Sequence, residues 1–171
     1  FRPGDIYKSR NGLTVEINNT DAEGRLILAD SISYVEEEAS ELIVCMATLT
    51  GAARVALGPD IVPFYTDNEK FSAILSESAL PNLDPVWRMP FHKPYEDLID
   101  SQVADLDNSP SGGMAGSILA ALFLKRFVLK KDRFVHFDIY GWSPNDKAGG
   151  SKGGVMQSVR TTFSLIKSLV N

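Results

Sequence analysis

The chain has 171 residues, of which 44% are hydrophobic and 23% charged, enough to bury the core of a single globular domain. A formal net charge of −5 argues against nucleic acid as an intrinsic partner, because the sequence offers no basic stripe to match a phosphate backbone. No apolar run reaches the roughly 20 residues that span a bilayer, and no signal peptide is recognised, so we expect no membrane partner.

The first predicted elements are a strand and a helix. Residues 13–17 alternate apolar and polar side chains, which is typical of a half-buried strand, and Asn11-Gly12 ahead of them predicts a hairpin turn. Residues 26–35 carry a helical pattern. The intervening segment therefore lies on a strand-to-helix turn, where open α/β sheets place their sites.

This turn contains two carboxylates and an arginine within five residues. Asp21 and Glu23 are hard oxygen ligands, close enough in sequence to share one cation or bridge two. Arg25 is a permanent cation with a planar fork of donors, which suits an anion or a developing oxyanion. The three side chains predict a site.

Three simpler interpretations compete. A residue among 19–21 is able to cap the helix, with Glu23 beside the positive end of the helix dipole and Arg25 in solvent. Residues 19–30 also match several positions of the calcium-binding EF-hand loop, but that motif requires a helix before the loop, where a strand is predicted. The third interpretation is an ordinary surface ion pair, which would contribute little.

The next strand ends close to a candidate binding segment. Residues 42–47 form a continuous apolar run, typical of a buried parallel strand, and Cys45 within it is expected to be an inert core thiol. A single unpaired cysteine fits a reducing cytoplasm. Residues 48–51 follow, with hydroxyls and a glycine that expose backbone to a peptide ligand, unless they are a plain strand-to-helix connection. If this strand neighbours the strand over 13–17, the two segments lie together.

Strands and helices continue to alternate. Residues 61–65 and 134–139 predict strands, and residues 68–80 and 114–127 predict helices, the latter apolar almost all round and therefore buried. We expect His136 to be structural, and we expect Trp87 in the core. The last helix is expected to turn one apolar stripe to the core, made of Val155, Val159, Phe163, Ile166 and Val170.

The alternation predicts one domain over residues 1–171 with an α/β fold. The expected architecture has three layers, a mixed and mostly parallel sheet with helices on both faces.

The octet Asn-Thr-Asp-Ala-Glu-Gly-Arg-Leu, residues 19–26, resembles the signature of the leucyl (cytosol) aminopeptidase family of dinuclear metallopeptidases. Four further segments resemble family segments in the same order and approximate spacing, so the resemblance covers nearly the whole chain. They are residues 47–52, 103–106, 115–116 with the apolar helix that follows, and 136–139.

The resemblance implies an enzyme that removes the N-terminal residue of a peptide with two divalent cations, zinc or manganese, that share a bridging water. It implies Asp21 and Glu23 as metal ligands. It implies Arg25 as the catalytic residue that binds a bicarbonate ion, which serves as proton shuttle.

The second segment resembles the family's contacts to the peptide substrate, which fall on Thr48, Leu49 and Gly51. Family members form hexamers, so we expect a homo-oligomer. The family pattern has alanine where Tyr140 stands, and this bulky residue, with Trp142 nearby, indicates a divergent branch and puts a leucine preference in doubt.

The family's other metal ligands, a lysine and two aspartates, and a second lysine that assists catalysis come from a segment before the octet, and nothing in residues 1–18 resembles it. Because the chain also starts at Phe1, we expect the C-terminal part of a catalytic domain, inactive alone, in a protein that is an enzyme when complete. The alternative is a non-catalytic scaffold subunit that keeps the fold without a complete site.

Overall fold

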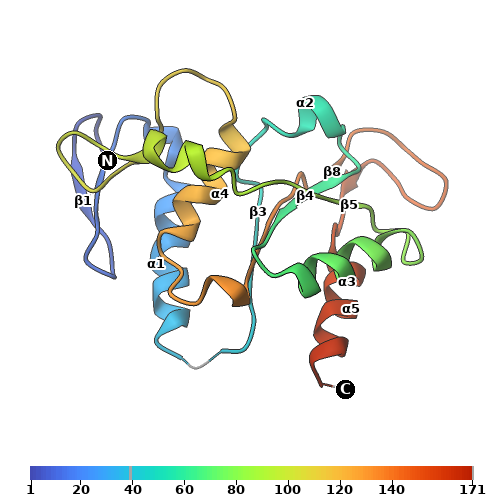
Figure 1. The fold of residues 1–171 in the computed structure, drawn as a ribbon. Helices are drawn as coiled ribbons and strands as arrows, with labels where there is room; N and C mark the ends of the chain where they lie inside the picture. Colours follow the sequence, from blue (N-terminus) through green and yellow to red (C-terminus); the bar gives the residue numbers. More distant parts are fainter. Residues whose placement is uncertain (39, 171) are drawn as a thin grey trace.

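The computed structural model describes residues 1–38 and 40–170, which form two main sheets with helices packed around them (Figure 1). The larger sheet contains β3 (Ile43–Ala47), β4 (Val62–Tyr65), β5 (Val86–Arg88) and β7 (Phe134–Asp138). Its strand order is β3-β7-β4-β5. β3 runs parallel to β7 and β4 parallel to β5, whereas β4 and β7 are antiparallel.

A smaller sheet holds the start of the chain and consists of β1 (Ile6–Lys8), β2 (Thr14–Glu16) and β6 (Leu106–Asp107). β1 and β2 form an antiparallel hairpin, as the turn at Asn11-Gly12 predicts. β2 also pairs in parallel with β6, which brings the residues after β6 beside the acidic turn. The short strands β8 (Trp142–Ser143) and β9 (Gly153–Gly154) form a separate ribbon.

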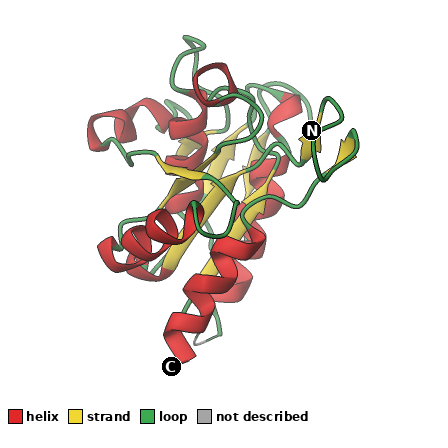
Figure 2. Cartoon of the chain, turned by 90° about the vertical axis from the view of Figure 1, so that its right-hand side faces the viewer, coloured by secondary structure: helices red, strands yellow, loops and turns green. Residues whose placement is uncertain are grey.

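Helices cover both faces of the larger sheet (Figures 1 and 2). The helices α1 (Gly24–Glu36) and α4 (Gly116–Lys125) lie on one face, and α3 (Glu69–Ala79) and α5 (Val159–Val170) on the other. The short helices are α2 (Arg54–Leu57), η1 (Thr20–Ala22), η2 (Lys93–Ile99) and η3 (Lys131–Arg133). The predicted α/β fold, with a mixed and mostly parallel sheet between helical layers, is confirmed. None of the helices in the described ranges combines the length and apolar composition needed to cross a membrane.

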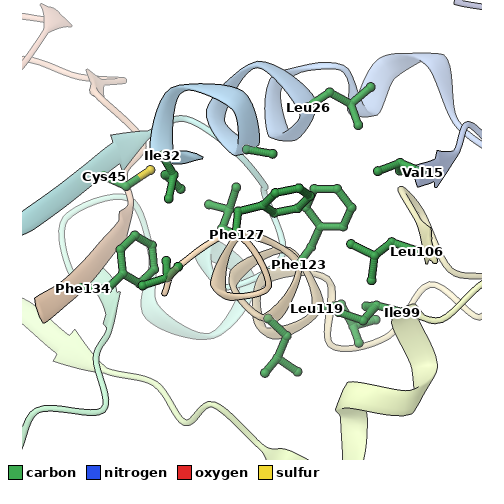
Figure 3. Packing of buried hydrophobic residues seen from close by; sticks show 14 of the residues in the cluster. Val15, Leu26, Ile32, Cys45, Ile99, Leu106, Leu119, Phe123, Phe127 and Phe134 are labelled. Atoms are coloured by element: carbon green, nitrogen blue, oxygen red, sulfur yellow. The ribbon is translucent and has the colours of Figure 1, made fainter. Parts of the chain in front are cut away.

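Strand β7 contributes to a separate core on each of its faces. Phe134 packs with residues of α1 and α4, whereas Val135 and Phe137 pack with residues of α3 and α5. In the first core the rings of Phe123 and Phe127 lie 5.3 Å apart beneath α1 (Figure 3). Each such buried side chain stabilises the fold by about 1.5–3 kcal/mol, so the sheet is held firmly from both sides.

The core-facing stripe predicted for the last helix is wrong. All five of its residues are substantially exposed, and α5 begins only at Val159. The helix turns the opposite face inward, with Thr161, Thr162 and Leu165 buried and Leu169 partly so. The prediction for Trp87 is also wrong, because β5 is an edge strand and the indole points to solvent.

The side chain of Asp84 fixes which face of α5 is buried. Its carboxylate accepts hydrogen bonds from the backbone N–H groups of Ser158 (2.7 Å) and Thr161 (3.0 Å) at the start of the helix. The backbone carbonyl of Asp84 accepts a further bond from the Thr161 hydroxyl. A buried carboxylate at a helix N-terminus satisfies free N–H groups and complements the dipole, and it sets the rotation of α5 about its axis.

Candidate active site

The acidic turn is held in place by two asparagines. Asn19 begins the short helix η1, and its side-chain oxygen accepts a hydrogen bond from the backbone N–H of Asp21 at 2.9 Å. Asn108, fully buried after β6, accepts from the backbone N–H of Asn18 (2.8 Å) and donates to the carbonyl of Asn19 (2.7 Å). The turn therefore has a defined shape that does not depend on its carboxylates.

Asp21 and Glu23 are both exposed and unused by the fold. Within residues 1–38 and 40–170 neither carboxylate takes part in a hydrogen bond or an ion pair, and Glu23, at the N-cap position of α1, makes no side-chain cap. The helix cap in this segment is the side chain of Asn19, at the start of η1. The EF-hand interpretation fails because strand β2, not a helix, precedes the loop, and the surface ion-pair interpretation fails because Arg25 contacts neither acid.

Arg25 turns away from the two acids toward the protein interior. Its Nη1 donates to the backbone carbonyl of Asn108 at 2.6 Å, and its guanidinium lies 5.8 Å from the ring centre of Phe123. Burial lowers the pKa of the guanidinium, while the charges of Asp107 and Asp138 oppose that shift. The Arg25 Nε is buried without a hydrogen-bond partner among the described residues. A partly buried cation with an unused donor is suited to binding an anion.

A cavity of about 720 Å³ joins the acidic turn to the end of β3. All six predicted site residues line it: Asp21, Glu23, Arg25, Thr48, Leu49 and Gly51. Ser109 and Gly116 also belong to the lining. A peptide terminus fits a cavity of this size. The structure therefore brings the six residues together along one cavity, and their roles there stay a prediction.

The condition stated for the two segments to meet, that their strands are neighbours, is not fulfilled, since β2 and β3 belong to different sheets. They meet through the N-terminus of α1. A Cβ atom on Gly24 would lie 3.8 Å from Leu49 Cδ1, so the first turn of α1 approaches the β3 loop directly. A Cβ on Gly51 would lie 2.8 Å from an Arg54 guanidinium nitrogen, the far end of a flexible side chain that would have to move aside.

The chemistry of Asp21 and Glu23 fits a divalent cation, but their number is small. Exposed carboxylates with no protein partner are oxygen donors that zinc and manganese accept, and no protein contact has to be broken for them to bind. A tight transition-metal site usually has three or four protein ligands. In the part of the chain that the structure describes, no three His, Cys, Asp or Glu side chains are grouped closely enough to hold an ion.

Asp138 is a buried residue beside the cavity that the sequence did not single out. Its carboxylate accepts hydrogen bonds from the backbone N–H groups of Leu49 (3.2 Å) and Thr50 (2.9 Å). It also accepts from the hydroxyls of Thr50 and Ser117. The only signal in the sequence is the resemblance of residues 136–139 to a family segment.

Two further residues lie outside the cavity lining. His136 is fully buried, with Nδ1 3.3 Å from the carbonyl oxygen of Cys45, which agrees with the structural role expected for it. The guanidinium of Arg54 lies over the ring of Tyr140, 4.2 Å from the centre of that ring. Neither His136 nor Tyr140 lines the cavity.

Known proteins match this chain along almost its full length. The family described as cytosol aminopeptidase family, catalytic domain, matches residues 1–163. The cytosol aminopeptidase of Encephalitozoon cuniculi is 44% identical over 170 residues, a match that covers 98% of this chain and 35% of that protein. A probable cytosol aminopeptidase of Chlorobium phaeobacteroides is 41% identical over 168 residues, covering 97% and 33%.

Solved structures give the same result. The cytosol aminopeptidase of Coxiella burnetii superposes with a TM-score of 0.94 at 41% identity, covering 100% of this chain and 37% of its own. The bottromycin maturation enzyme BotP in complex with Mn superposes with a TM-score of 0.93 at 30% identity, covering 99% and 38%. The chain spans about a third of the length of the curated relatives it matches. Fold, site and matched length together show that this chain belongs to the cytosol aminopeptidase family and lies within its catalytic domain.

Proposed function

We propose that the complete protein containing this chain is a metal-dependent aminopeptidase, and that this chain supplies about half of its active site. The observation that carries the proposal is the pair of unpaired carboxylates, Asp21 and Glu23, on the wall of a cavity that also exposes Arg25 and the β3 loop. The manganese bound by BotP, a structural neighbour, supports a divalent cation.

Asp21 and Glu23 would hold two divalent cations, zinc or manganese, together with ligands from elsewhere in the complete protein. Cations in such a site lower the pKa of a bound water and polarise the carbonyl of the bond to be cleaved. The Asn19 and Asn108 bonds hold the backbone of the turn that carries the two acids, so the turn itself is in place before a cation binds.

Arg25 and the β3 loop would act on the other reactants. The Arg25 guanidinium stays charged despite its burial, because its pKa starts far above neutrality, and it would bind a bicarbonate ion that accepts and returns a proton. Thr48, Leu49 and Gly51 would bind the peptide substrate from the opposite wall of the cavity. We further propose a cytoplasmic homo-oligomer, a hexamer as in the family, without nucleic-acid or membrane partners.

The first experiment uses the full-length protein and amino-acid arylamides. Hydrolysis should be lost on treatment with a chelator and restored by Mn²⁺ or Zn²⁺, because the cations activate the water. In the same assay Arg25→Ala should lower kcat by about 100-fold, the lower end of general acid–base contributions, with metal content unchanged because arginine is not a ligand. Arg88→Ala, which removes a surface partner of Glu69, is the control and should leave kcat unchanged. Robust chelator-resistant hydrolysis would refute the metal mechanism.

A non-catalytic scaffold subunit is the second candidate, favoured by the small number of metal ligands among the described residues. The two candidates differ in the rest of the gene product. A lysine and two aspartates in a segment before the octet support the enzyme, and their absence supports the scaffold.

A further inference from the structure

Asp138 is a buried carboxylate held by hydrogen-bond donors, and the charge of Arg25 acts on it without forming an ion pair. The side chain is 4% exposed, and among the described residues no lysine or arginine forms an ion pair with it. Oδ1 accepts from the backbone N–H groups of Leu49 and Thr50, and Oδ2 accepts from the hydroxyls of Thr50 and Ser117. Hydrogen bonds to an ionised acceptor are about twice as strong as neutral ones, so this carboxylate holds its partners tightly.

The position of Asp138 explains why its partners lie in the β3 loop. In the parallel pair of β3 and β7, Asp138 lies opposite Ala47, the last residue of β3, and the Ile139 N–H donates to the Ala47 carbonyl at 2.9 Å. Beyond Ala47 the chain leaves the sheet, so its next amides have no strand to pair with. The side chain of Asp138 takes the place of that strand for Leu49 and Thr50.

A second set of contacts fixes Asp138 itself. Ser117, in the first turn of α4, donates to Asp138 Oδ2 at 2.8 Å, and its hydroxyl lies 2.7 Å from the hydroxyl of Tyr65 at the end of β4. Both partners are buried, with the Tyr65 ring enclosed in the core. The network joins two strands and a helix to one loop. Releasing the loop would take away the Leu49 and Thr50 donors and leave the buried carboxylate with the Ser117 hydroxyl, which is strongly unfavourable.

We propose that Asp138 is a positioning residue of the active site, which fixes the backbone of residues 48–51 so that Thr48, Leu49 and Gly51 can bind the peptide. This inference rests on the proposed function. Asp138 does not line the cavity, so its effect on the substrate passes through the loop. Substrate binding, more than the chemical step, is therefore the property that it controls.

The test compares variants of the full-length protein by KM, kcat, metal content and amide hydrogen exchange of residues 48–51. Asp138→Ala removes all four bonds and should raise KM at least about tenfold with kcat within about threefold, since ground-state binding is lost. Asp138→Asn keeps an acceptor for both amides, and the hydroxyls can rotate to accept from its NH₂, so KM should stay within about threefold of the wild type. Thr50→Val removes one bond and should raise KM about threefold, a result that stands even if Asp138→Ala fails to fold.

Val135→Ala is the matched control, since Val135 lies on the same strand but faces the α3–α5 core. It should lower the melting temperature while KM and exchange in the loop stay unchanged. Protection of the Leu49 and Thr50 amides should fall at least about tenfold in Asp138→Ala relative to this control. Unchanged protection, or an unchanged KM in Asp138→Ala with the stability loss of Val135→Ala, would overturn the positioning role. Absence of arylamide hydrolysis by the wild type would instead overturn the proposed function.

Discussion

His136 is a buried histidine whose surroundings suit only the neutral ring. Its Nδ1 lies 3.3 Å from the Cys45 carbonyl and donates to it, while Nε2 has no partner among the described residues. The ring stacks on Tyr65 with centres 5.9 Å apart. Burial lowers the pKa of His136 to about 4, against the opposing charge of Asp138 and the hydrogen bond to Cys45. The ring is therefore neutral at physiological pH and packs as a core residue.

This pKa predicts how stability depends on pH. An unfolded histidine takes up its proton near pH 6.5, whereas folded His136 does so only near pH 4, so the unfolded chain binds more protons between these values. The free energy of unfolding should fall as pH drops from 6.5 toward 4, by at most about 1.4 kcal/mol per pH unit. Above pH 6.5 the residue should contribute no pH dependence.

Melting temperatures of the full-length protein between pH 7.5 and 4.5 give the measurement. His136→Phe keeps a ring against Tyr65 but cannot titrate, so its melting temperature should fall less steeply with acid than that of the wild type. His92→Gln, a change at an exposed histidine that meets the Tyr95 ring edge to face, should keep the wild-type slope. Parallel acid profiles for the wild type and His136→Phe would contradict the prediction.

Residues of the site differ in how far the sequence could reveal them. Asp21, Glu23 and Arg25 lie in one octet, so their chemistry and spacing are visible together. Asn108 and Asp138 bind backbone groups of the site that lie 83 to 90 residues away in sequence, and each is a single polar residue in a segment with its own pattern. A local hydrophobic pattern indicates a helix or strand and which of its faces is buried. It does not indicate which distant backbone group a side chain will bind.

At the scale of elements, local periodicity predicted the strands and buried helices but not the orientation of α5. That helix has apolar residues on two faces, and positions two apart lie about 200° apart around the axis. The exposed face is the more apolar one. The Asp84 contacts to the start of the helix, 74 and 77 residues apart in sequence, select the other face, which periodicity cannot show.

This orientation makes a prediction about two neighbouring positions of α5. Leu165 is 0% exposed and Phe163 is 64% exposed. Leu165→Ala should destabilise the protein by about 2–5 kcal/mol because it leaves a cavity against α3. Phe163→Ser should change stability by no more than about 0.5 kcal/mol in the isolated chain, because the ring leaves no core contact behind. Chemical denaturation of the two variants measures both values, and a larger loss for Phe163→Ser would contradict the orientation.

At the scale of the whole molecule, alternating strands and helices predicted three layers but not the division into two sheets. Strand β2 pairs with β1 and β6, and β3 pairs with β7, partners that no local pattern identifies. The site lies where the two sheets approach each other, between the N-terminus of α1 and the end of β3. Its two walls therefore belong to different sheets, and each wall is fixed by its own network, around Asn108 and Asp138.

Those networks are hydrogen bonds between protein groups, which leads to a prediction about the 171-residue chain produced alone. Its apolar cores and the Asn108 and Asp138 bonds should let the sheets and α4 fold, because none of these contacts needs a cation. Asp21 and Glu23 give two carboxylates where three or four protein ligands are usual, so we expect no stoichiometric metal and no peptidase activity.

Elemental analysis after dialysis is the measurement, and Asp21→Asn in the full-length protein is the comparison. Loss of one of the proposed ligands should there reduce bound zinc or manganese and activity together, by about 10-fold or more, since metal affinity depends on ligand count and charge. The isolated chain should already bind as little metal as the full-length Asp21→Asn variant. Asp21→Asn in the isolated chain should therefore not change its metal content. Near-stoichiometric metal held by the isolated chain through dialysis would contradict the prediction, because it would require ligands other than Asp21 and Glu23 within these 171 residues.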